Sequence, residues 1–392
     1  MSDPPATLKG MIRTLAVENY RSLRKLIVPL SGLNVITGAN GSGKSSLYRA
    51  LRLLADAGQG GAVTALAREG GLPSAVWAGD RKQEPAGLRL GFAGDEFGYA
   101  VDFGVPQSSG AQPGGGPSMF ALDPEVKREC TWAGPVLRPA ALLCDRAGPA
   151  VRTRTADGGW HRSQGIRPYD SMLSEFADPQ LAPDLLRLRE LIRSWRFYDH
   201  VRTDAEAPAR AARVGTRTPV LAHDGADLAA ALQTIRETGD DEALDAAVDA
   251  AFPGSRVRIA DNGGRFEIQL HQRGLRRPLG PAELSDGTLR YLLWTAALLT
   301  PRPPALLVLN EPETSLHPDL LRPLAELILT AAKDTQVVLV THAQDLADAI
   351  AEGARSHRTD VNSIELFKES GQTEVAGRDS MLDEPLWYWP KR

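Results

Sequence analysis

Eight consecutive residues near the start of the chain have the types and spacing needed to hold a chain of phosphates. They read Gly38-Ala39-Asn40-Gly41-Ser42-Gly43-Lys44-Ser45 and match G-x-x-x-x-G-K-[ST] at every fixed position. Glycines let the backbone fold so that consecutive N–H groups point inward, and a helix N-terminus adds partial positive charge. The pattern predicts that Lys44 lies between the β- and γ-phosphates of a nucleotide and that the Ser45 hydroxyl binds Mg²⁺.

The flanking sequence supports this prediction. Residues 33–37 form a short apolar run that predicts a strand, and a helix is predicted over residues 43–57. The alternative is a chance glycine-rich turn, which would require neither a strand before it nor a helix after it. We therefore expect a phosphate loop here and include the next residue, Ser46, among the nucleotide-binding residues.

A second motif is the polar end of an apolar strand at residues 306–311. Its last residue, Glu311, is a candidate general base for an attacking water, the alternative being a simple surface acid. An Asp is expected at the preceding position to hold the water shell of Mg²⁺, but the chain has Asn310. Asn keeps an acceptor oxygen and loses the negative charge. We expect weaker Mg²⁺ retention through water and slower hydrolysis, with nucleotide binding retained.

Two further segments have residues that could sense a phosphate. Ser285 and Gly287, in Leu284-Ser285-Asp286-Gly287-Thr288, stand at a predicted helix start, where a hydroxyl and a glycine can form an anion site. The alternative is that Ser285 simply caps the helix. His342 follows an apolar strand at residues 336–340. A lone His at a strand end is usually structural, but its place one βα unit after Glu311 favours a functional role.

The order of these motifs resembles that of ABC-type ATPase heads in the RecF, SMC and OLD-like group. Residues 284–288 resemble the ABC signature, residues 312–318 the D-loop and residues 338–342 the switch segment, and the likeness covers residues 11–58 and 276–345. OLD proteins carry a C-terminal Toprim nuclease, whereas only 50 residues follow His342 here. The chain is therefore similar to stand-alone predicted AAA-family ATPases without a Toprim domain.

The resemblance implies a mechanism with ATP and Mg²⁺ and with a second copy of the chain as partner. Two heads would dimerise on ATP, each ATP being completed by Ser285 and Gly287 of the other copy. Lys44, Glu311 and His342 would be the catalytic residues, with His342 sensing the γ-phosphate and Arg21 approaching the adenine. A Gln-loop is also expected, and Gln83 and Gln107 both remain possible. The implied nucleotide contacts are Gly38, Ala39, Asn40, Gly41, Ser42, Gly43, Lys44, Ser45, Ser46, Arg21, Ser285 and Gly287, and the metal contacts are Ser45 and, through water, Asn310.

The predicted elements describe an α/β protein with a P-loop NTPase fold, that is, an ABC-ATPase-like head with an antiparallel β region and a helical insertion lobe. Strands are predicted at 11–18, 23–30 and repeatedly within 88–155, helix within 171–252, and a hairpin at 257–270 around Asn262-Gly263-Gly264. From residue 283 helices and strands alternate, which indicates parallel strands. We expect the N-terminal strands and these strands to share one sheet. The predicted divisions are 1–170 with a mobile loop at 104–117, 171–275 for the insertion, and 276–392.

Composition places the chain among soluble globular proteins. It has 392 residues, a formal net charge of −4, 42% hydrophobic and 24% charged residues. The first ten residues lack the apolar region of a signal peptide, and no apolar run approaches the roughly 18 residues that cross a bilayer. Cys130 and Cys144 are too few for a disulfide framework. We expect a cytoplasmic protein that does not contact a membrane.

Three functions are compatible with these observations. The first is a DNA-linked ATPase in repair, replication or phage defence, the link to DNA coming from the resemblance. The second is a slow or non-hydrolysing ATP switch that regulates an effector protein encoded nearby, which Asn310 motivates. The third, the nucleotide-binding subunit of a membrane transporter, fits the mixed insert less well.

Two surface patterns are interpreted as structural. An Arg-rich helix face is diluted by acidic neighbours, so we interpret it as solvated surface rather than a nucleic-acid site. The aromatic tail at residues 387–389 is expected to pack on its own lobe. The Arg residues are Arg187, Arg189, Arg193 and Arg196, and the acidic neighbours are Asp184, Glu190 and Asp199.

Overall fold

The computed structural model describes residues 10–79, 87–106, 119–120, 122–155, 157–176, 178–199, 201–378 and 384–391. The chain divides into two compact units. The first unit comprises Met1–Ser31, Ile36–Trp195 and Ile364–Arg392, and the second comprises Gly32–Val35 and Arg196–Ser363. The division falls within β3 (Leu33–Gly38) and β16 (Val361–Glu369), so each of these strands contributes residues to both units.

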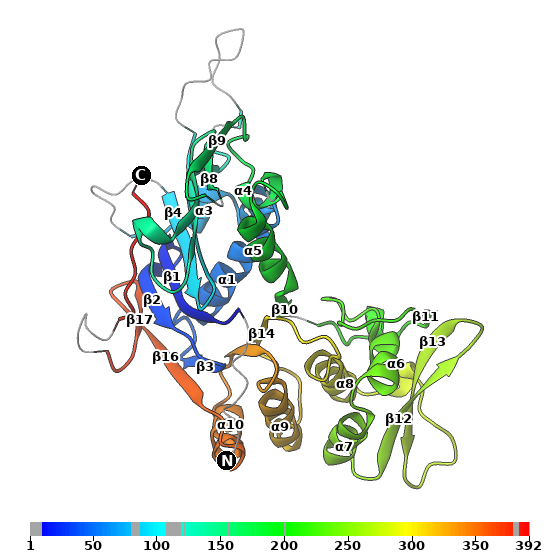
Figure 1. The fold of residues 1–392 in the computed structure, drawn as a ribbon. Helices are drawn as coiled ribbons and strands as arrows, with labels where there is room; N and C mark the ends of the chain where they lie inside the picture. The colour runs from blue at the N-terminus through cyan, green and yellow to red at the C-terminus, as the bar shows by residue number, and fades with distance from the viewer. Residues whose placement is uncertain are drawn as a thin grey trace, which may run out of the picture. The chain divides into compact units, whose positions relative to one another are not determined.

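The first unit contains an eight-stranded antiparallel sheet in the order β2-β1-β4-β5-β6-β7-β8-β9. Strands β1, β2, β4, β8 and β9 of this sheet are labelled in Figure 1. The antiparallel strands predicted within residues 88–155 are therefore confirmed. Of the loop predicted at 104–117, Gly104 ends β5 and residues 107–117 lie outside the described residues. The strands are β1 (Ile12–Tyr20), β2 (Leu23–Pro29), β4 (Gly87–Gly94), β5 (Phe97–Gly104), β6 (Glu125–Ala133), β7 (Leu142–Ala147), β8 (Ala150–Arg154) and β9 (Trp160–Gln164).

Helices α1, α4 and α5 pack together in the first unit (Figure 1). A Cβ on Gly58, the last residue of α1, would lie 3.1 Å from Ile192 of α5 and 3.3 Å from Leu173 of α4, so glycine permits this close approach. The helices are α1 (Lys44–Gly58), α2 (Ala62–Arg68), α3 (Leu72–Ala75), α4 (Met172–Glu175) and α5 (Pro183–Ser194), with a 3₁₀ turn η1 (Pro139–Ala141) and a further strand β17 (Gln372–Val375) paired with β16.

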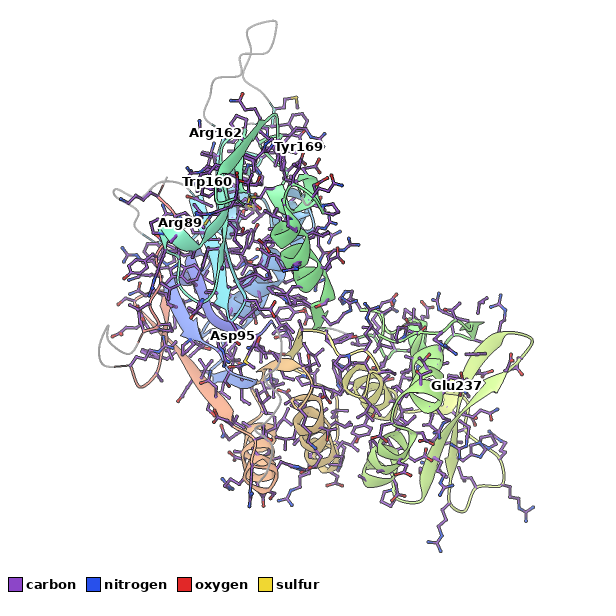
Figure 2. All side chains as sticks on the ribbon, viewed as in Figure 1. Arg89, Asp95, Trp160, Arg162, Tyr169 and Glu237 are labelled. Carbon is purple, nitrogen blue, oxygen red and sulfur yellow. The ribbon has the colours of Figure 1, made fainter. Side chains whose placement is uncertain are left out.

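The aromatic tail packs within the first unit, as predicted. The Trp387 ring lies edge-on to Trp132 of β6 at 5.7 Å between centroids and to Trp389 at 5.2 Å. The Arg89 guanidinium lies 6.0 Å from the Trp389 ring, and Arg89 is labelled on this unit in Figure 2. These contacts explain the aromatic tail without a partner protein.

The second unit has parallel strands β10, β14 and β15 with the first residues of β3 beside β15. Strands β10 and β14 pair in parallel, as do β14 and β15, and the Val337 amide donates to the Gly32 carbonyl at 2.8 Å. A separate antiparallel group has the order β11-β13-β12. The strands are β10 (Arg196–Tyr198), β11 (Arg213–Val214), β12 (Ser255–Asp261), β13 (Arg265–Gln272), β14 (Leu306–Asn310) and β15 (Gln336–Val340). The helices are α6 (Leu228–Thr238), α7 (Asp241–Ala251), α8 (Asp286–Leu298), α9 (Leu321–Ala331) and α10 (Gln344–His357), with 3₁₀ turns η2 (Pro208–Arg210), η3 (Pro281–Glu283) and η4 (Pro318–Leu320).

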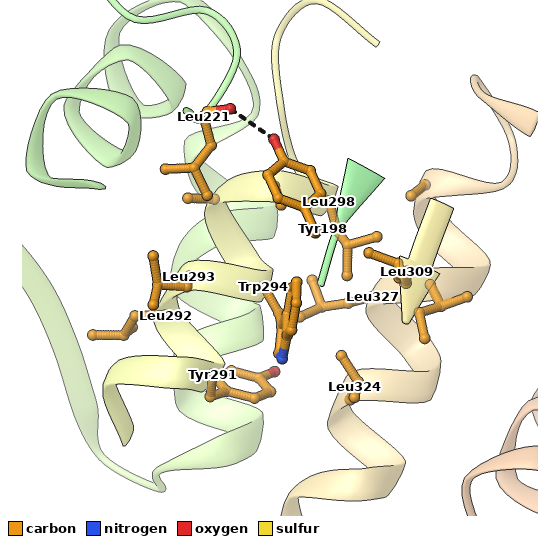
Figure 3. Close-up of a cluster of buried hydrophobic side chains, with 14 of the residues drawn as sticks. Tyr198, Leu221, Tyr291, Leu292, Leu293, Trp294, Leu298, Leu309, Leu324 and Leu327 are labelled. Atoms are coloured by element: carbon orange, nitrogen blue, oxygen red, sulfur yellow. Dashed lines mark hydrogen bonds between the residues drawn. The ribbon is translucent and has the colours of Figure 1, made fainter. Parts of the chain in front are cut away.

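Helix α8 forms the centre of the second unit's core (Figure 3). Every residue from position 289 to 298 is buried, as expected for a helix surrounded by other elements. The Trp294 ring packs edge-on to Tyr198 of β10 at 6.3 Å, and its Nε1 donates to the Pro312 carbonyl at 2.9 Å. The Tyr198 hydroxyl donates to the Leu221 carbonyl at 2.8 Å. This core holds the start of α8 and the end of β14 in fixed positions.

Two fold predictions are wrong in detail. Residues 171–252 were predicted as helix, but residues 196–227 contain β10, η2, β11 and connecting turns. Pro208 and Pro219 interrupt helical periodicity, and a three-residue strand is too short to show its own period. Strands β1 and β2 belong to the antiparallel sheet with β4, whereas only β3 of the N-terminal strands pairs with β15. The hairpin around Asn262 is confirmed, and the three predicted divisions stay a prediction.

Both cysteines are free and buried, which leads to a prediction about thiol reactivity. Burial raises the pKa of the Cys144 thiol to about 12 and raises that of Cys130 further. At pH 8 the thiolate fraction of Cys144 is then about 10⁻⁴, and the thiolate is the reactive form. We expect both thiols to resist Ellman's reagent in the folded protein and to react fully in denaturant. Rapid reaction in the native state would contradict the burial.

A helix long and apolar enough to cross a membrane does not occur in the part of the chain that the structure describes.

Candidate functional site

The phosphate loop has the strand–loop–helix geometry that its sequence predicts. It connects β3 to α1, and Gly38, Gly41 and Gly43 all have positive φ, at 144°, 78° and 110°. A Cβ at Gly38 would overlap the Leu366 carbonyl, and one at Gly43 would overlap the Thr373 side chain. Glycine is therefore required at these two positions both by backbone conformation and by space.

Lys44 and Ser42 give the loop an interior suited to phosphate. The Lys44 ammonium is buried and donates to the carbonyls of Gly38 at 2.6 Å and Ala39 at 3.1 Å, so it lies under the loop. The Ser42 hydroxyl is buried without a hydrogen-bond partner among the described residues. Helix α1 has no acidic residue in its first turn, and Ser45 is exposed there. An unpartnered donor, an ammonium and a helix N-terminus together fit a bound phosphate chain.

Thr373 holds the loop in place, and the sequence analysis missed it. Its Oγ1 lies 2.9 Å from the Ser42 carbonyl and 2.8 Å from the Ser22 hydroxyl. Because a hydroxyl has one proton, Thr373 donates to the carbonyl and accepts from Ser22. The Thr373 amide also donates to the Ser22 carbonyl at 2.8 Å. Thr373 is more than 300 residues away in sequence, so no local pattern indicates this contact.

Arg21 lies in the two-residue turn between β1 and β2 rather than on a strand, with φ 50°. Its guanidinium pairs with Glu69 at 2.9 Å, and Glu69 also accepts from the Tyr20 hydroxyl at 2.7 Å. Burial, together with Glu69, raises the pKa of Tyr20 above its ordinary value. The adenine contact of Arg21 stays a prediction. Gln83 and Gln107 lie outside the described residues.

In the second unit, Glu311 follows the last residue of β14 in a strained backbone conformation. Its φ is 49°, which is uncommon for a residue with a side chain and is often found at functional sites. The Glu311 amide donates to the Val340 carbonyl at 2.8 Å, which fixes this conformation. The carboxylate Oε1 lies 3.9 Å from the His342 Nδ1, and 30% of the side chain is exposed. The second unit therefore brings Glu311 and His342 together.

Glu313 is a positioning residue that the sequence analysis did not single out. Its buried Oε1 accepts from the Thr341 hydroxyl at 2.6 Å and from the amides of His342 at 3.1 Å and Ala343 at 3.3 Å. It also lies 3.3 Å from the His342 Nδ1. The carboxylate therefore fixes the segment after β15. Its only sequence signal is a second Glu two residues after Glu311.

Asn310 lies beside a carboxylate on the neighbouring strand. Its Nδ2 donates to the Asp199 Oδ1 at 2.8 Å, and its own Oδ1 is buried without a partner among the described residues. The register of β10 and β14 pairs Tyr198 with Leu309, so the next residue of each strand, Asp199 and Asn310, adjoin. From sequence, Asp199 is interpreted as one of the acids that dilute the Arg-rich helix face, whereas the structure places it after β10. The contact with Asn310 arises from strand pairing, which local sequence does not reveal.

The oxygens of Asp199 and Asn310 are of the types that fit a magnesium ion. Mg²⁺ commonly takes one or two protein oxygen ligands together with water and substrate phosphates. Within the described ranges, no group of three or more His, Cys, Asp or Glu residues is placed to hold a metal alone. The carboxylate of Asp199 and the unpartnered amide oxygen of Asn310 are the donor types that Mg²⁺ prefers.

Ser285 caps α8 and also faces an open hollow. Its Oγ accepts from the Thr288 amide at 3.1 Å, so the helix-cap alternative describes its local contact correctly. Ser285 is nevertheless exposed, and the hollow of about 610 Å³ beside it is also lined by Gly287, Ser315 and His317. A Cβ on Gly287 would lie 3.2 Å from the Ser315 carbonyl, so a small residue fits best. The segments that resemble the signature and the D-loop thus line one hollow.

Arg210 fixes the segment that leads into α8, and its removal should lower the stability of the protein. Its guanidinium donates to the Pro281 carbonyl, to the Leu284 carbonyl at 2.8 Å and to Asp286 at 2.9 Å. Only 10% of the side chain is exposed, and each hydrogen bond contributes about 1 kcal/mol. We expect Arg210→Ala to lower the free energy of unfolding by about 3 kcal/mol in urea denaturation.

The matched control is Arg217→Ala, an exposed Arg in the same segment. We expect a change within about 0.5 kcal/mol of the wild type for this control. Equal effects of the two substitutions would show that Arg210 does not hold the signature segment.

The Arg-rich helix face has the ion pairs of a solvated surface. Arg187 lies 3.7 Å from Asp184, and Arg189 and Arg193 lie 3.4 Å and 3.5 Å from Glu190. Such pairs at a helix surface contribute little and offer no concentrated positive field. For Arg187, Arg189 and Arg193 this agrees with the interpretation from sequence. Arg196 does not belong to the helix face, because α5 ends at Ser194 and Arg196 is the first residue of β10.

Comparison with solved structures establishes the fold. A Smc head bound to the C-winged helix domain of ScpA matches with a TM-score of 0.50 at 14% identity, covering 93% of this chain and 97% of that chain. A Smc head domain with an extended coiled coil bound to the C-terminal domain of ScpA, from Pyrococcus furiosus, gives 0.48 at 13% identity, covering 93% and 95%. The SMC head domain from Thermotoga maritima gives 0.45 at 16% identity, covering 94% and 99%. Together with the motifs, the first match defines an ATPase head of the ABC/SMC type with a P-loop NTPase fold.

The family follows from the sequence itself. Residues 33–348 match the family described as "AAA domain, putative AbiEii toxin, Type IV TA system". This is most of the chain, and the chain belongs to that family. No curated protein matches the sequence significantly. Membership gives the chain an AAA domain, which is a nucleotide-binding ATPase fold.

Proposed function

We propose that this protein binds ATP with Mg²⁺ at the phosphate loop, hydrolyses it and dimerises head to head while ATP is bound. The observation that carries the proposal is the loop itself. Three glycines with positive φ, the buried ammonium of Lys44 and the unpartnered hydroxyl of Ser42 lie at the start of α1. A triphosphate is the ligand that this combination of backbone and side-chain donors suits best.

Each residue has a distinct task in the proposed reaction. Lys44 neutralises charge on the β- and γ-phosphates, and the Ser45 hydroxyl provides a metal ligand. Glu311 accepts a proton from the attacking water and orients it. His342 donates a hydrogen bond to the γ-phosphate, and Glu313 holds its segment in position. Mg²⁺ would supply further neutralisation of the charge that develops on the phosphates.

The second copy of the chain completes the site in this proposal. Ser285 and Gly287 present a helix N-terminus and a hydroxyl beside an open hollow, which is suited to an anion delivered from outside. The thirteen-residue helix α8 behind it is rigidly packed. We infer that each γ-phosphate contacts Ser285 and Gly287 of the other copy, and that hydrolysis reopens the dimer.

DNA is the partner that the resemblance to RecF-like and SMC-like heads implies, in repair, replication or phage defence. Support comes from the family resemblance alone, because the Arg residues of α5 are paired with acids. The test is a titration with duplex and single-stranded DNA at two salt concentrations. Binding weakened by salt, or stimulation of ATP hydrolysis, would support this role, and the lack of both would contradict it.

A second candidate function is a slow or non-hydrolysing ATP switch that regulates an effector protein. Asn310 favours it, because this side chain has no negative charge where a metal-binding Asp is expected. The description of the family, which names a toxin and a toxin–antitoxin system, also fits a function exerted through another protein. Single-turnover hydrolysis decides between the two candidates, since turnover at ordinary rates would exclude the switch.

A further inference from the structure

The exchange of Asp for Asn at position 310 is accompanied by a carboxylate at the adjoining strand end. Asn310 is 8% exposed, and its amide donates to the Asp199 carboxylate at 2.8 Å. We propose that Asp199 supplies the negative charge that Asn310 lacks, so that the two side chains together hold the water shell of Mg²⁺. This inference rests on the proposed ATP binding. It assigns to Asp199 the retention of Mg²⁺ at that site.

The parallel register places these groups at equivalent ends of adjacent strands. Tyr198 pairs with Leu309, so Asp199 follows β10 as Asn310 ends β14. Polar groups at the carboxyl ends of neighbouring parallel strands are the usual source of ligands in such sheets. Strand β10 is held by the Tyr198 hydroxyl bond to the Leu221 carbonyl and by the packing of Tyr198 on Trp294. These contacts fix the end of β10, which Asp199 follows.

The hydrogen bond between the two residues also orients Asn310. A carboxylate can only accept, so the amide turns its NH₂ toward Asp199 and its oxygen away. That oxygen is buried and has no partner among the described residues, and a buried acceptor without a partner is destabilising. A water of a magnesium shell would satisfy it, since such a water donates its protons outward. Asp199 thus contributes charge, and Asn310 contributes an aligned acceptor.

Electrostatic repulsion favours one Asp and one Asn at this pair of strand ends over two Asp residues. Two carboxylates at this distance would repel each other. The Asn310 amide donates to the Asp199 carboxylate, and one carboxylate with one amide places one formal negative charge at the pair. This is the charge that an Asp at position 310 beside a neutral neighbour would provide, carried instead by the strand next to it.

The test is the magnesium dependence of nucleotide binding, measured with a fluorescent ATP analogue in EDTA and across a magnesium titration. Asp199→Asn is a clean removal of charge, because its amide oxygen still accepts from Asn310. We expect this variant to need at least tenfold more Mg²⁺ for half-maximal binding, with affinity in EDTA unchanged. The reciprocal exchange, Asp199→Asn with Asn310→Asp, should return the requirement to within about threefold of the wild type.

Asp334→Asn, which removes an exposed Asp in the same unit, is the matched control and should behave as the wild type. Paramagnetic resonance of Mn²⁺ added to the protein–nucleotide complex gives an independent measure of metal retention. A magnesium requirement of Asp199→Asn within twofold of the wild type would overturn the role of Asp199 and leave ATP binding intact. An absence of nucleotide binding in the wild type, with or without Mg²⁺, would overturn the proposed function and this inference together.

Discussion

Lys44→Ala is expected to lose at least tenfold, and up to about a hundredfold, in affinity for ATP. The substitution removes the one full positive charge within the phosphate loop, where the Lys44 ammonium donates hydrogen bonds to the carbonyls of Gly38 and Ala39. Hydrogen bonds to charged groups contribute about 1.5–3 kcal/mol, and 1.4 kcal/mol is a factor of ten in affinity. Equilibrium titration with a fluorescent ATP analogue measures the loss.

Lys25→Ala is the control for this experiment, because Lys25 is exposed on β2 of the same unit and lies outside the loop. It removes the same charge from the protein. It therefore separates the local contacts of Lys44 from the effect of the protein's net charge on ATP binding. We expect wild-type affinity for Lys25→Ala. Tight ATP binding by Lys44→Ala would show that the nucleotide binds elsewhere.

Glu311→Gln is expected to keep ATP affinity within about threefold of the wild type and to lower the hydrolysis rate by about 10²–10⁴. Glutamine preserves the shape of the side chain but cannot accept the proton of the attacking water. Because hydrolysis reopens the proposed dimer, this variant should accumulate a dimer with ATP. Single-turnover hydrolysis and light scattering with and without ATP measure the two effects.

Glu237→Gln is the matched control, since Glu237 is an exposed residue at the end of α6 (Figure 2). It should hydrolyse ATP at the wild-type rate and should dissociate after turnover. Normal hydrolysis by Glu311→Gln would remove Glu311 from the catalytic role. A dimer that does not respond to ATP or to the substitution would contradict the ATP-dependent closure.

Sequence alone predicts the elements that carry strong local signals. The phosphate loop, the first helix after it and the strand at residues 336–340 are found where the glycines, the Lys and the apolar runs indicate. The hairpin at Asn262 is also confirmed, because Asn-Gly-Gly selects a tight turn. Pairing between distant strands is different, since periodicity gives no partner. For this reason β1 and β2 were assigned to the wrong sheet.

The same limit applies to the candidate site. Spacing within a motif identifies Lys44, Glu311 and His342, which stay predictions until nucleotide binding and hydrolysis are measured. Thr373, Glu313 and Asp199 make their contacts through residues 331, 28 and 111 positions away. Only the folded chain brings these pairs together. Local sequence places Asp199 near a helix face, but α5 ends at Ser194 and Asp199 follows β10.

The most direct test of the account is a crystal structure of Glu311→Gln grown with ATP and magnesium. The account predicts a triphosphate enclosed by residues 38–45, with the γ-phosphate contacted by Ser285 of a second copy. A triphosphate bound at any other surface, or bound at this loop by a single copy with Ser285 facing solvent, would contradict it.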